Sequence, residues 1–151
     1  MATKNNNQKG FTLIELLVVM GILAVLLTAV LMAINPSRQF AQARDSQRRN
    51  DVLAVLDAVQ QSMADNKGVL PGSITATPTE IKTGGIDLCS ELMPKYISIL
   101  PSDPSLNTSL TVCPASPATY ATNYYISKDS DGRVTVTANG KEIATSISVT
   151  R

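Results

Sequence analysis

Residues 11–34 form an apolar run of 24 residues in which Glu15 is the only charged side chain. A helix of this length measures roughly 36 Å, which is enough to cross a hydrocarbon core of about 30 Å with some tilt. A membrane-spanning helix therefore constrains the fold more strongly than any other feature of the chain. Because an ionisable side chain inside a membrane span is costly, Glu15 is expected to have a functional partner.

Gly10 and Phe11 stand at the start of this run, directly after the short polar segment 1–10. The segment differs from an ordinary secretory leader, in which the cleavage site follows the apolar region. Cleavage between Gly10 and Phe11 would leave the apolar helix on the mature chain and create a new α-amino group on Phe11. Glu15 could then pair with that amine on a neighbouring copy of the chain.

The start of the apolar run reads Lys9-Gly10-Phe11-Thr12-Leu13-Ile14-Glu15, followed by Leu16-Leu17-Val18-Val19. Over about residues 9–34, this sequence resembles the type IV prepilin family, which includes the pseudopilins of type II secretion. The resemblance implies that a cytoplasm-facing prepilin peptidase cleaves after Gly10 and N-methylates Phe11. It also implies that Glu15 neutralises the amine of an adjacent subunit and helps to set the register of the fibre.

Two further segments resemble this family with lower specificity. Residues 35–39 and 43–45 are similar to the helices of many bacterial pilins. Residues 100–104, Leu-Pro-Ser-Asp-Pro, are similar to the proline-rich stretch of major pseudopilins. The Trp-Gly pair that commonly follows that stretch is replaced here by Ser105-Leu106, which is a departure from the secretion-system pattern.

A second helix is predicted over residues 35–66, because the apolar run is broken at Asn35-Pro36. Asn is a favoured helix cap, and Pro is well tolerated at the first helical position. Apolar residues then recur at spacings of four, three and four, and they are Val52, Leu56, Val59 and Met63. This single apolar stripe predicts an amphipathic helix that packs against the C-terminal part of the chain.

Residues 67–151 are expected to form a globular head that ends in a three-stranded antiparallel sheet. The predicted strands are residues 120–127, 133–138 and 141–149, with a loop over 73–87 and a short helix over 87–96. Asp131-Gly132 and Asn139-Gly140 lie between the strands and are strong hairpin signals. The expected fold class is thus α+β and pilin-like: a long N-terminal helix, whose first half spans the membrane, packs on a small C-terminal antiparallel sheet.

Cys89 and Cys113 are the two cysteines of the chain, and both lie far from the apolar run. In an exported domain such a pair predicts one disulfide. Closing a loop of about 25 residues would stabilise the fold by roughly 3–4 kcal/mol through the entropy of the unfolded chain. The alternative is a pair of buried free thiols.

Two features of the sequence predict opposite orientations of the chain in the membrane. Counting basic residues at the ends of the span favours a cytoplasmic C-terminal side, because Arg38, Arg44, Arg48 and Arg49 outnumber Lys4 and Lys9. The prepilin resemblance and the expected disulfide both favour an extracytoplasmic head. We give these two more weight, since the motif is more specific than a count of charges.

Composition narrows the possible chemistry. The chain contains no His, which excludes a Ser-His-Asp triad, a Cys-His dyad and His-ligated zinc. Net charge is +1, and the four arginines 38, 44, 48 and 49 alternate with acidic residues, unlike a dense nucleic-acid footprint. We expect no enzyme activity, cofactor, metal ion or nucleic-acid partner, and we expect these arginines to serve intersubunit salt bridges or lipid phosphates.

Residues 129–132, Asp-Ser-Asp-Gly, are similar to the start of a calcium-binding loop. A complete loop would require a Glu near residue 140, and Glu142 stands two positions too late. Because the segment lies between two predicted strands, a turn is the better interpretation.

The resemblance implies a structural subunit of a type IV pilus-like filament. Its domains would be a leader (1–10), a transmembrane and filament-core helix (11–34), an amphipathic helix (35–66) and the head (67–151). The implied partners are further copies of the chain, other pilins, the prepilin peptidase, the pilus assembly platform and the membrane. The protein would begin as a single-pass membrane protein and end in an extracellular pilus or a periplasmic pseudopilus. The alternatives are a type II secretion pseudopilin and a membrane-anchored domain that does not polymerise.

Overall fold

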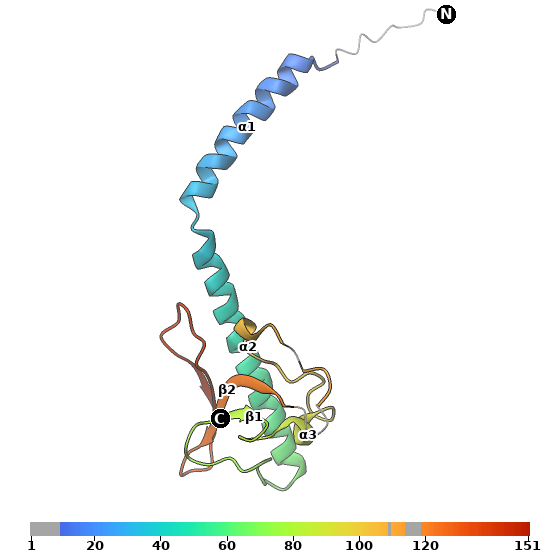
Figure 1. Cartoon of the computed structure of the whole chain (residues 1–151), viewed down its shortest axis with the longest axis vertical. Helices are drawn as coiled ribbons and strands as arrows, with labels where there is room; N and C mark the ends of the chain where they lie inside the picture. The colour runs from blue at the N-terminus through green and yellow to red at the C-terminus, as the bar shows by residue number, and fades with distance from the viewer. Residues whose placement is uncertain (1–9, 109, 114–118) are drawn as a thin grey trace, which may run out of the picture. The chain divides into compact units, whose positions relative to one another are not determined.

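The computed structural model describes residues 10–108, 110–113 and 119–151. The chain divides into two compact units, of which one ends at Ser37 and the other begins at Arg38. Helices and strands follow one another in the order α1, α2, β1, α3, β2, β3 and β4, with a short 3-10 turn before β2 (Figure 1). The α+β fold class is confirmed.

Helix α1 (Leu13–Ala33) makes up most of the first unit. It begins at the cap residue Thr12 and ends where the N–H of Ile34 donates to the carbonyl of Val30. None of its residues is buried within the described chain, and it is long and apolar enough to cross a membrane. Leu, Ile and Val occupy every side of the helix, so it has no polar face to present to water.

Helix α2 (Pro36–Asp65) has Pro at its first position, where the missing N–H removes no helical hydrogen bond. Val52, Leu56 and Val59 are fully buried, so the predicted apolar stripe is confirmed. The helix ends at residues with left-handed backbone, Lys67 (φ 56°) and Gly68 (φ 84°). The N–H of Gly68 donates to the carbonyl of Met63, which satisfies one of the last helical acceptors.

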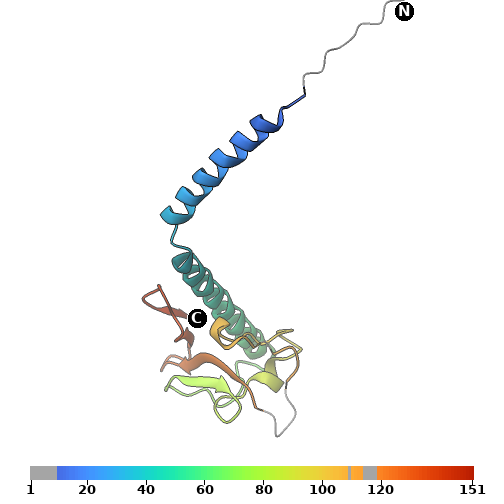
Figure 2. The same ribbon diagram turned by 45° about the horizontal axis from the view of Figure 1, so that its top comes forward.

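The sheet has four antiparallel strands in the order β1-β2-β3-β4. Its strands are β1 (Thr79–Lys82), β2 (Ala121–Lys128), β3 (Val134–Ala138) and β4 (Ile147–Thr150). Burial alternates along β2 and β3, so one face of the sheet is apolar and the other is polar. The apolar face lies against α2 (Figures 1 and 2).

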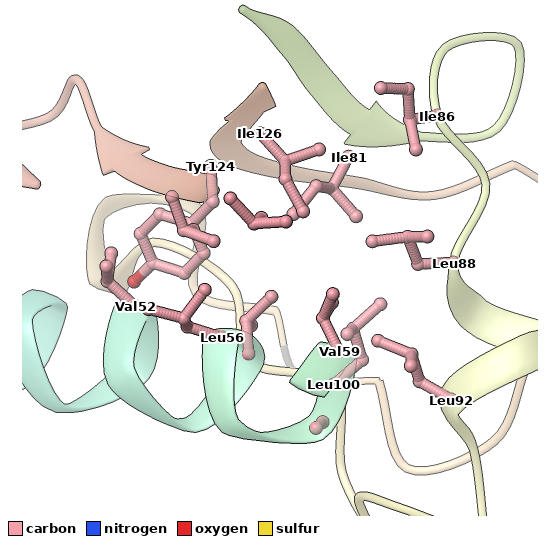
Figure 3. Packing of buried hydrophobic residues seen from close by; sticks show 14 of the residues in the cluster. Val52, Leu56, Val59, Ile81, Ile86, Leu88, Leu92, Leu100, Tyr124 and Ile126 are labelled. Carbon is pink, nitrogen blue, oxygen red and sulfur yellow. The ribbon is translucent and has the colours of Figure 1, made fainter. Parts of the chain in front are cut away.

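The core of the second unit forms between α2 and this face. Figure 3 shows Val52, Leu56 and Val59 of α2 pointing toward Tyr124 and Ile126 of β2 and Ile81 of β1. Leu88, Leu92 and Leu100 close the far end, around the short helix α3 (Cys89–Leu92). Burying each such side chain contributes about 1.5–3 kcal/mol, so this unit carries a hydrophobic core of its own.

The predicted sheet was wrong in two places. Strand β1 was missed, because it has only four residues and only Ile81 among them is buried, which is too little alternation to predict a strand. The predicted third strand began at Lys141, but β4 begins at Ile147 and residues 139–146 form a longer connection. Asn139-Gly140 is therefore not a tight hairpin turn.

The cause of this longer connection lies on α2. The backbone N–H groups of Glu142, Ile143 and Ala144 all donate to the carboxylate of Asp45, at 3.0, 2.7 and 2.8 Å. In a tight hairpin the N–H of Ile143 would instead pair with Val136 of β3, because bonded pairs alternate along an antiparallel ladder. A tertiary contact from α2 has thus overridden a local turn preference.

Candidate processing and assembly site

Gly10 and Phe11 lie before the first turn of α1, in a segment without helical hydrogen bonds. The Phe11 side chain is 84% exposed. A Cβ built on Gly10 would meet nothing within 4 Å. The peptide bond between these two residues is therefore accessible, and no packing contact with the described residues requires glycine at position 10.

Glu15 is held by Thr12 in a capping box at the start of α1. The Thr12 backbone N–H and its hydroxyl both donate to Glu15 Oε2 at 2.8 Å. In return, the Glu15 N–H donates to the Thr12 hydroxyl oxygen at 3.3 Å. This arrangement satisfies helix N–H groups that lack a partner and places the carboxylate at the positive end of the helix dipole.

The two carboxylate oxygens of Glu15 differ in their surroundings. Both Thr12 donors bind Oε2, and among the described residues no hydrogen bond reaches Oε1. Glu15 is thus oriented by its own chain but retains acceptor capacity on one oxygen. Thr12 was not predicted as a site residue, although Thr followed three positions later by Glu, before an apolar run, is the sequence signature of a capping box.

The second unit contains a buried charge cluster around Arg48, whose side chain is only 1% exposed. Arg48 makes a two-pronged contact with Asp103, Nε to Oδ2 and Nη2 to Oδ1, both at 2.9 Å. Its Nη1 donates to Asp45 at 2.9 Å and to Glu142 at 3.0 Å. Arg44 reaches Glu142 from the outside, through Nε at 2.6 Å. We call Arg44, Asp45, Arg48, Asp103 and Glu142 the Arg48 cluster.

The electrostatics of the Arg48 cluster favour the charged forms. Burial raises the pKa of the Asp45 carboxyl, but three backbone N–H groups and Arg48 lower it further, so its pKa lies well below the ordinary value. Hydrogen bonds from Arg44 and then Arg48 lower the pKa of Glu142 to about 2. The pKa of Arg48 is raised, with Asp103 as the largest cause. All three residues therefore stay charged near neutral pH.

The prediction that the four arginines serve neighbouring subunits or lipids is wrong for Arg48, which is enclosed by carboxylates of its own chain. The burial of Arg48 could have been predicted from its position in the sequence. Asp45 and Arg48 continue the α2 stripe toward the N-terminus, seven and four residues before Val52. A stripe position predicts burial whatever the residue type, and a buried Arg requires acidic partners.

Cys89 and Cys113 are joined by a disulfide in the structure. Cys89 is buried at the start of α3, whereas Cys113 is half-buried in the irregular segment that precedes β2. The bond therefore ties that segment to the core, beside Leu88 and Leu92.

Asp129 closes the turn between β2 and β3. Its Oδ1 accepts the backbone N–H groups of Asp131 and Arg133 at 3.0 and 2.8 Å, and its Oδ2 accepts Arg133 Nε at 2.9 Å. The segment is a turn, as predicted, and Glu142 lies apart from it in the Arg48 cluster. Within the described residues, no group of three or more His, Cys, Asp or Glu side chains is arranged to hold a metal ion.

Comparison with known proteins agrees with the N-terminal geometry. A family model described as the prokaryotic N-terminal methylation motif matches residues 5–31, a range that includes Gly10, Phe11, Thr12 and Glu15. No curated protein and no solved structure matches the chain. The motif marks structural, pilin-type proteins, and α1 fits the single-pass anchor of such proteins. Residues 5–31 thus carry the cleavage and methylation signature of the type IV prepilins.

Proposed function

We propose that the protein is a pilin, the structural subunit of a type IV pilus-like filament. It would be made as a prepilin, cleaved after Gly10, N-methylated at Phe11 and polymerised through α1. The observation that carries this proposal is α1 itself, a 21-residue helix that is apolar on all sides and buries no residue within the described chain. Such a helix needs lipid before assembly and other helices after it.

Glu15 would determine how these helices align. Cleavage turns the Phe11 nitrogen into a charged amine, while the Thr12 N–H and hydroxyl remain in place to hold Glu15 Oε2. The second oxygen can then accept the Phe11 amine of a neighbouring subunit. Apolar contact alone specifies axial register poorly, whereas an unpaired charge in an apolar core costs several kcal/mol. Only an offset that pairs every amine with a carboxylate avoids that cost.

The domain boundaries and the location follow from the same proposal. Residues 1–10 would be the leader and 11–34 the membrane and filament-core helix, with the amphipathic helix 35–66 and the head 67–151 on the extracytoplasmic side. The Cys89–Cys113 disulfide supports this orientation, because disulfides persist in oxidising compartments. The partners would be the prepilin peptidase, the assembly platform and other pilins.

Processing is tested by mass spectrometry of the mature protein, which should begin at Phe11 and carry one N-terminal methyl group. Gly10→Val should leave the full leader in place, because it adds bulk beside the scissile bond, at a position where a Cβ meets no described atom within 4 Å. Gly21→Ala is the matched control, since a Cβ there also meets nothing within 4 Å, and it should be processed normally. An intact N-terminus on the wild-type protein, or a start near residue 35, would refute the prepilin proposal.

A second candidate is a pseudopilin of a type II secretion system. The observation in its favour is that residues 100–104, the stretch similar to major pseudopilins, are part of the structural framework: Leu100 and Asp103 are fully buried and Asp103 binds Arg48. Electron microscopy of cells with and without the gene separates the candidates. Long surface fibres that disappear with the gene indicate a pilin, whereas loss of protein secretion without loss of fibres indicates a pseudopilin.

A further inference from the structure

The two edge strands of the sheet, β1 and β4, differ in how well they are protected from pairing with another chain. At β1, the chain folds back so that Ile86 donates its N–H to the carbonyl of Glu80 and accepts the N–H of Lys82, both at 3.1 Å. The register shifts between Glu80 and Lys82, and these two side chains form an ion pair at 2.7 Å. Coverage, a bulge and charge are the usual means by which a protein protects a sheet edge from pairing with another chain.

Among the residues that the structure describes, none covers the edge at β4 in this way. Val134 and Arg151 exchange both backbone hydrogen bonds, N to O at 2.7 and 3.0 Å. Because paired residues in an antiparallel ladder alternate between bonded and non-bonded pairs, the bonded partners on β4 are Ile147, Val149 and Arg151. The N–H and C=O groups of Ser148 and Thr150 therefore point away from β3. Both residues are exposed, and within the described part of the chain nothing hydrogen-bonds to their N–H groups.

Strand β4 also lacks the side chains that discourage edge pairing. Its sequence, Ile-Ser-Val-Thr, contains no charge and no Pro, and its pairing with β3 runs without a register shift. The charged residue that follows, Arg151, is bound to Asp57 of α2 at 2.5 Å. Within the described residues, this edge is consequently uncharged, free of a bulge and open.

We propose that the β4 edge is an interaction surface for a second copy of this chain, in which two β4 strands pair antiparallel about a two-fold axis. Such an interface presents the same strand from both sides, so any charge on β4 would face its own copy. A neutral strand avoids that repulsion. The hydroxyl side chains match as well, because Thr and Ser pairs across antiparallel strands are favourable; Thr135 and Thr150 already form such a pair at 2.8 Å within the chain.

This contact lies in the second unit and does not depend on cleavage at Gly10 or on the filament proposal. It joins two four-stranded sheets through their open edges, and it leaves the β1 edges as the protected ends of the combined sheet. Main-chain hydrogen bonds would supply the affinity, as in other strand-addition complexes.

The test uses the full-length protein in detergent micelles, with amide hydrogen exchange and sedimentation measured over a range of protein concentrations. The wild-type protein should show slower exchange at Ser148 and Thr150 as concentration rises. Ser148→Lys places like charges across the two-fold axis and should weaken association about tenfold. Thr137→Lys is the matched control, because Thr137 is the register partner of Ser148 on β3 and adds the same charge away from the edge.

Association that is equal in the wild type and both variants would place the contact away from the β4 edge and overturn the proposal. Exchange at Ser148 and Thr150 that does not change with concentration would also overturn it, as would protection that appears only when a different protein is added. Slow exchange of Val136 in each variant confirms that the sheet remains folded, so a loss of association can be assigned to the edge.

Discussion

Glu15 and Arg48 are both charged residues in apolar surroundings, and the two units of the protein accommodate them differently. Arg48 makes four hydrogen bonds to three carboxylates of its own chain and is closed off from water. Among the described residues, only Thr12 binds the Glu15 carboxylate, through one oxygen, on a helix with no buried residue. The comparison indicates that the buried charge of the second unit is satisfied within its own chain, whereas α1 has surface and acceptor capacity for further partners.

The strongest test of this comparison removes Glu15. Glu15→Ala should leave membrane insertion and head folding intact, because its only described partner is Thr12 and the span loses a charge. Fibre formation should fall sharply, since each Phe11 amine would then be left unpaired in an apolar core at a cost of about 3–5 kcal/mol. Fibres are counted by electron microscopy in cells that make equal amounts of protein.

Glu15→Gln is the matched variant, because it keeps the size and removes the charge. We expect it to fail as well. If cells with either variant show fibres as abundant and regular as the wild type, the charge of Glu15 is not needed for assembly. The proposed difference between Glu15, which would serve assembly, and Arg48, which would serve folding, would then be wrong.

Arg48 should show the opposite pattern: its substitution should lower the stability of the second unit. Arg48→Met in the fragment 38–151 should lower the free energy of unfolding by about 3–5 kcal/mol, because it leaves Asp45 and Asp103 buried without their cation. The measurement is urea unfolding followed by circular dichroism. Arg49→Met, one position along on the exposed side of α2, should change stability by less than about 0.5 kcal/mol. Equal effects of the two variants would show that the cluster does not stabilise the fold.

The same experiment requires that the fragment folds without α1. Every buried hydrophobic residue that the structure describes lies between Val52 and Ile147, so residues 38–151 should be folded with mixed α/β circular dichroism. Aggregation or an unfolded spectrum would mean that α1 contributes to the core of the head, and the boundary at residue 38 would be wrong.

Acid should affect the Arg48 cluster over a defined range of pH. The pKa of Glu142 in the folded protein is about 2, below its ordinary value of 4.5. A lowered pKa means that the unfolded chain binds protons first, so the stabilisation is complete above about pH 4.5 and is lost as pH falls toward 2. Unfolding midpoints in urea from pH 6 to about 2 should decline for the wild-type fragment, and Glu142→Gln should remove part of that decline. An identical decline in both would exclude Glu142 as its source.

The parts of this structure that depend on local pattern could be predicted from the sequence, and those that depend on tertiary contact could not. The apolar run predicted α1, and the four-three-four spacing of apolar residues from Val52 to Met63 predicted the buried face of α2. The tight hairpin predicted at Asn139-Gly140 does not form, because Asp45 binds the Ile143 N–H that this hairpin would have used. Nothing in the local sequence links these two positions.

The candidate sites also divide into those that a local motif predicts and those that only tertiary contact creates. Gly10, Phe11 and Glu15 belong to one short motif, so sequence reasoning could find them. The Arg48–Asp103 contact joins residues 55 positions apart, and only the fold brings them together. Arg48 could have been predicted as buried from its position on the α2 stripe, but its partners could not.

The smallest effect concerns Thr12, and it refines the comparison on the α1 side. Thr12→Ala removes the hydroxyl that donates to Glu15 and accepts the Glu15 N–H, but keeps the backbone N–H that also binds Oε2. Loss of a helix cap costs about 1 kcal/mol, so the first turn of α1 should fray while the rest of the helix persists. Thr12→Ser retains the hydroxyl and should behave like the wild type.

Amide exchange in detergent micelles at Glu15 and Leu16 measures the fraying of the first turn, and fibre counts measure its effect on assembly. If Thr12 only caps the helix, Thr12→Ala should reduce fibre number far less than Glu15→Ala. A loss as severe as that of Glu15→Ala would mean that orienting the carboxylate matters as much as its charge, and α1 would then depend on a fixed internal geometry much as the second unit depends on Arg48.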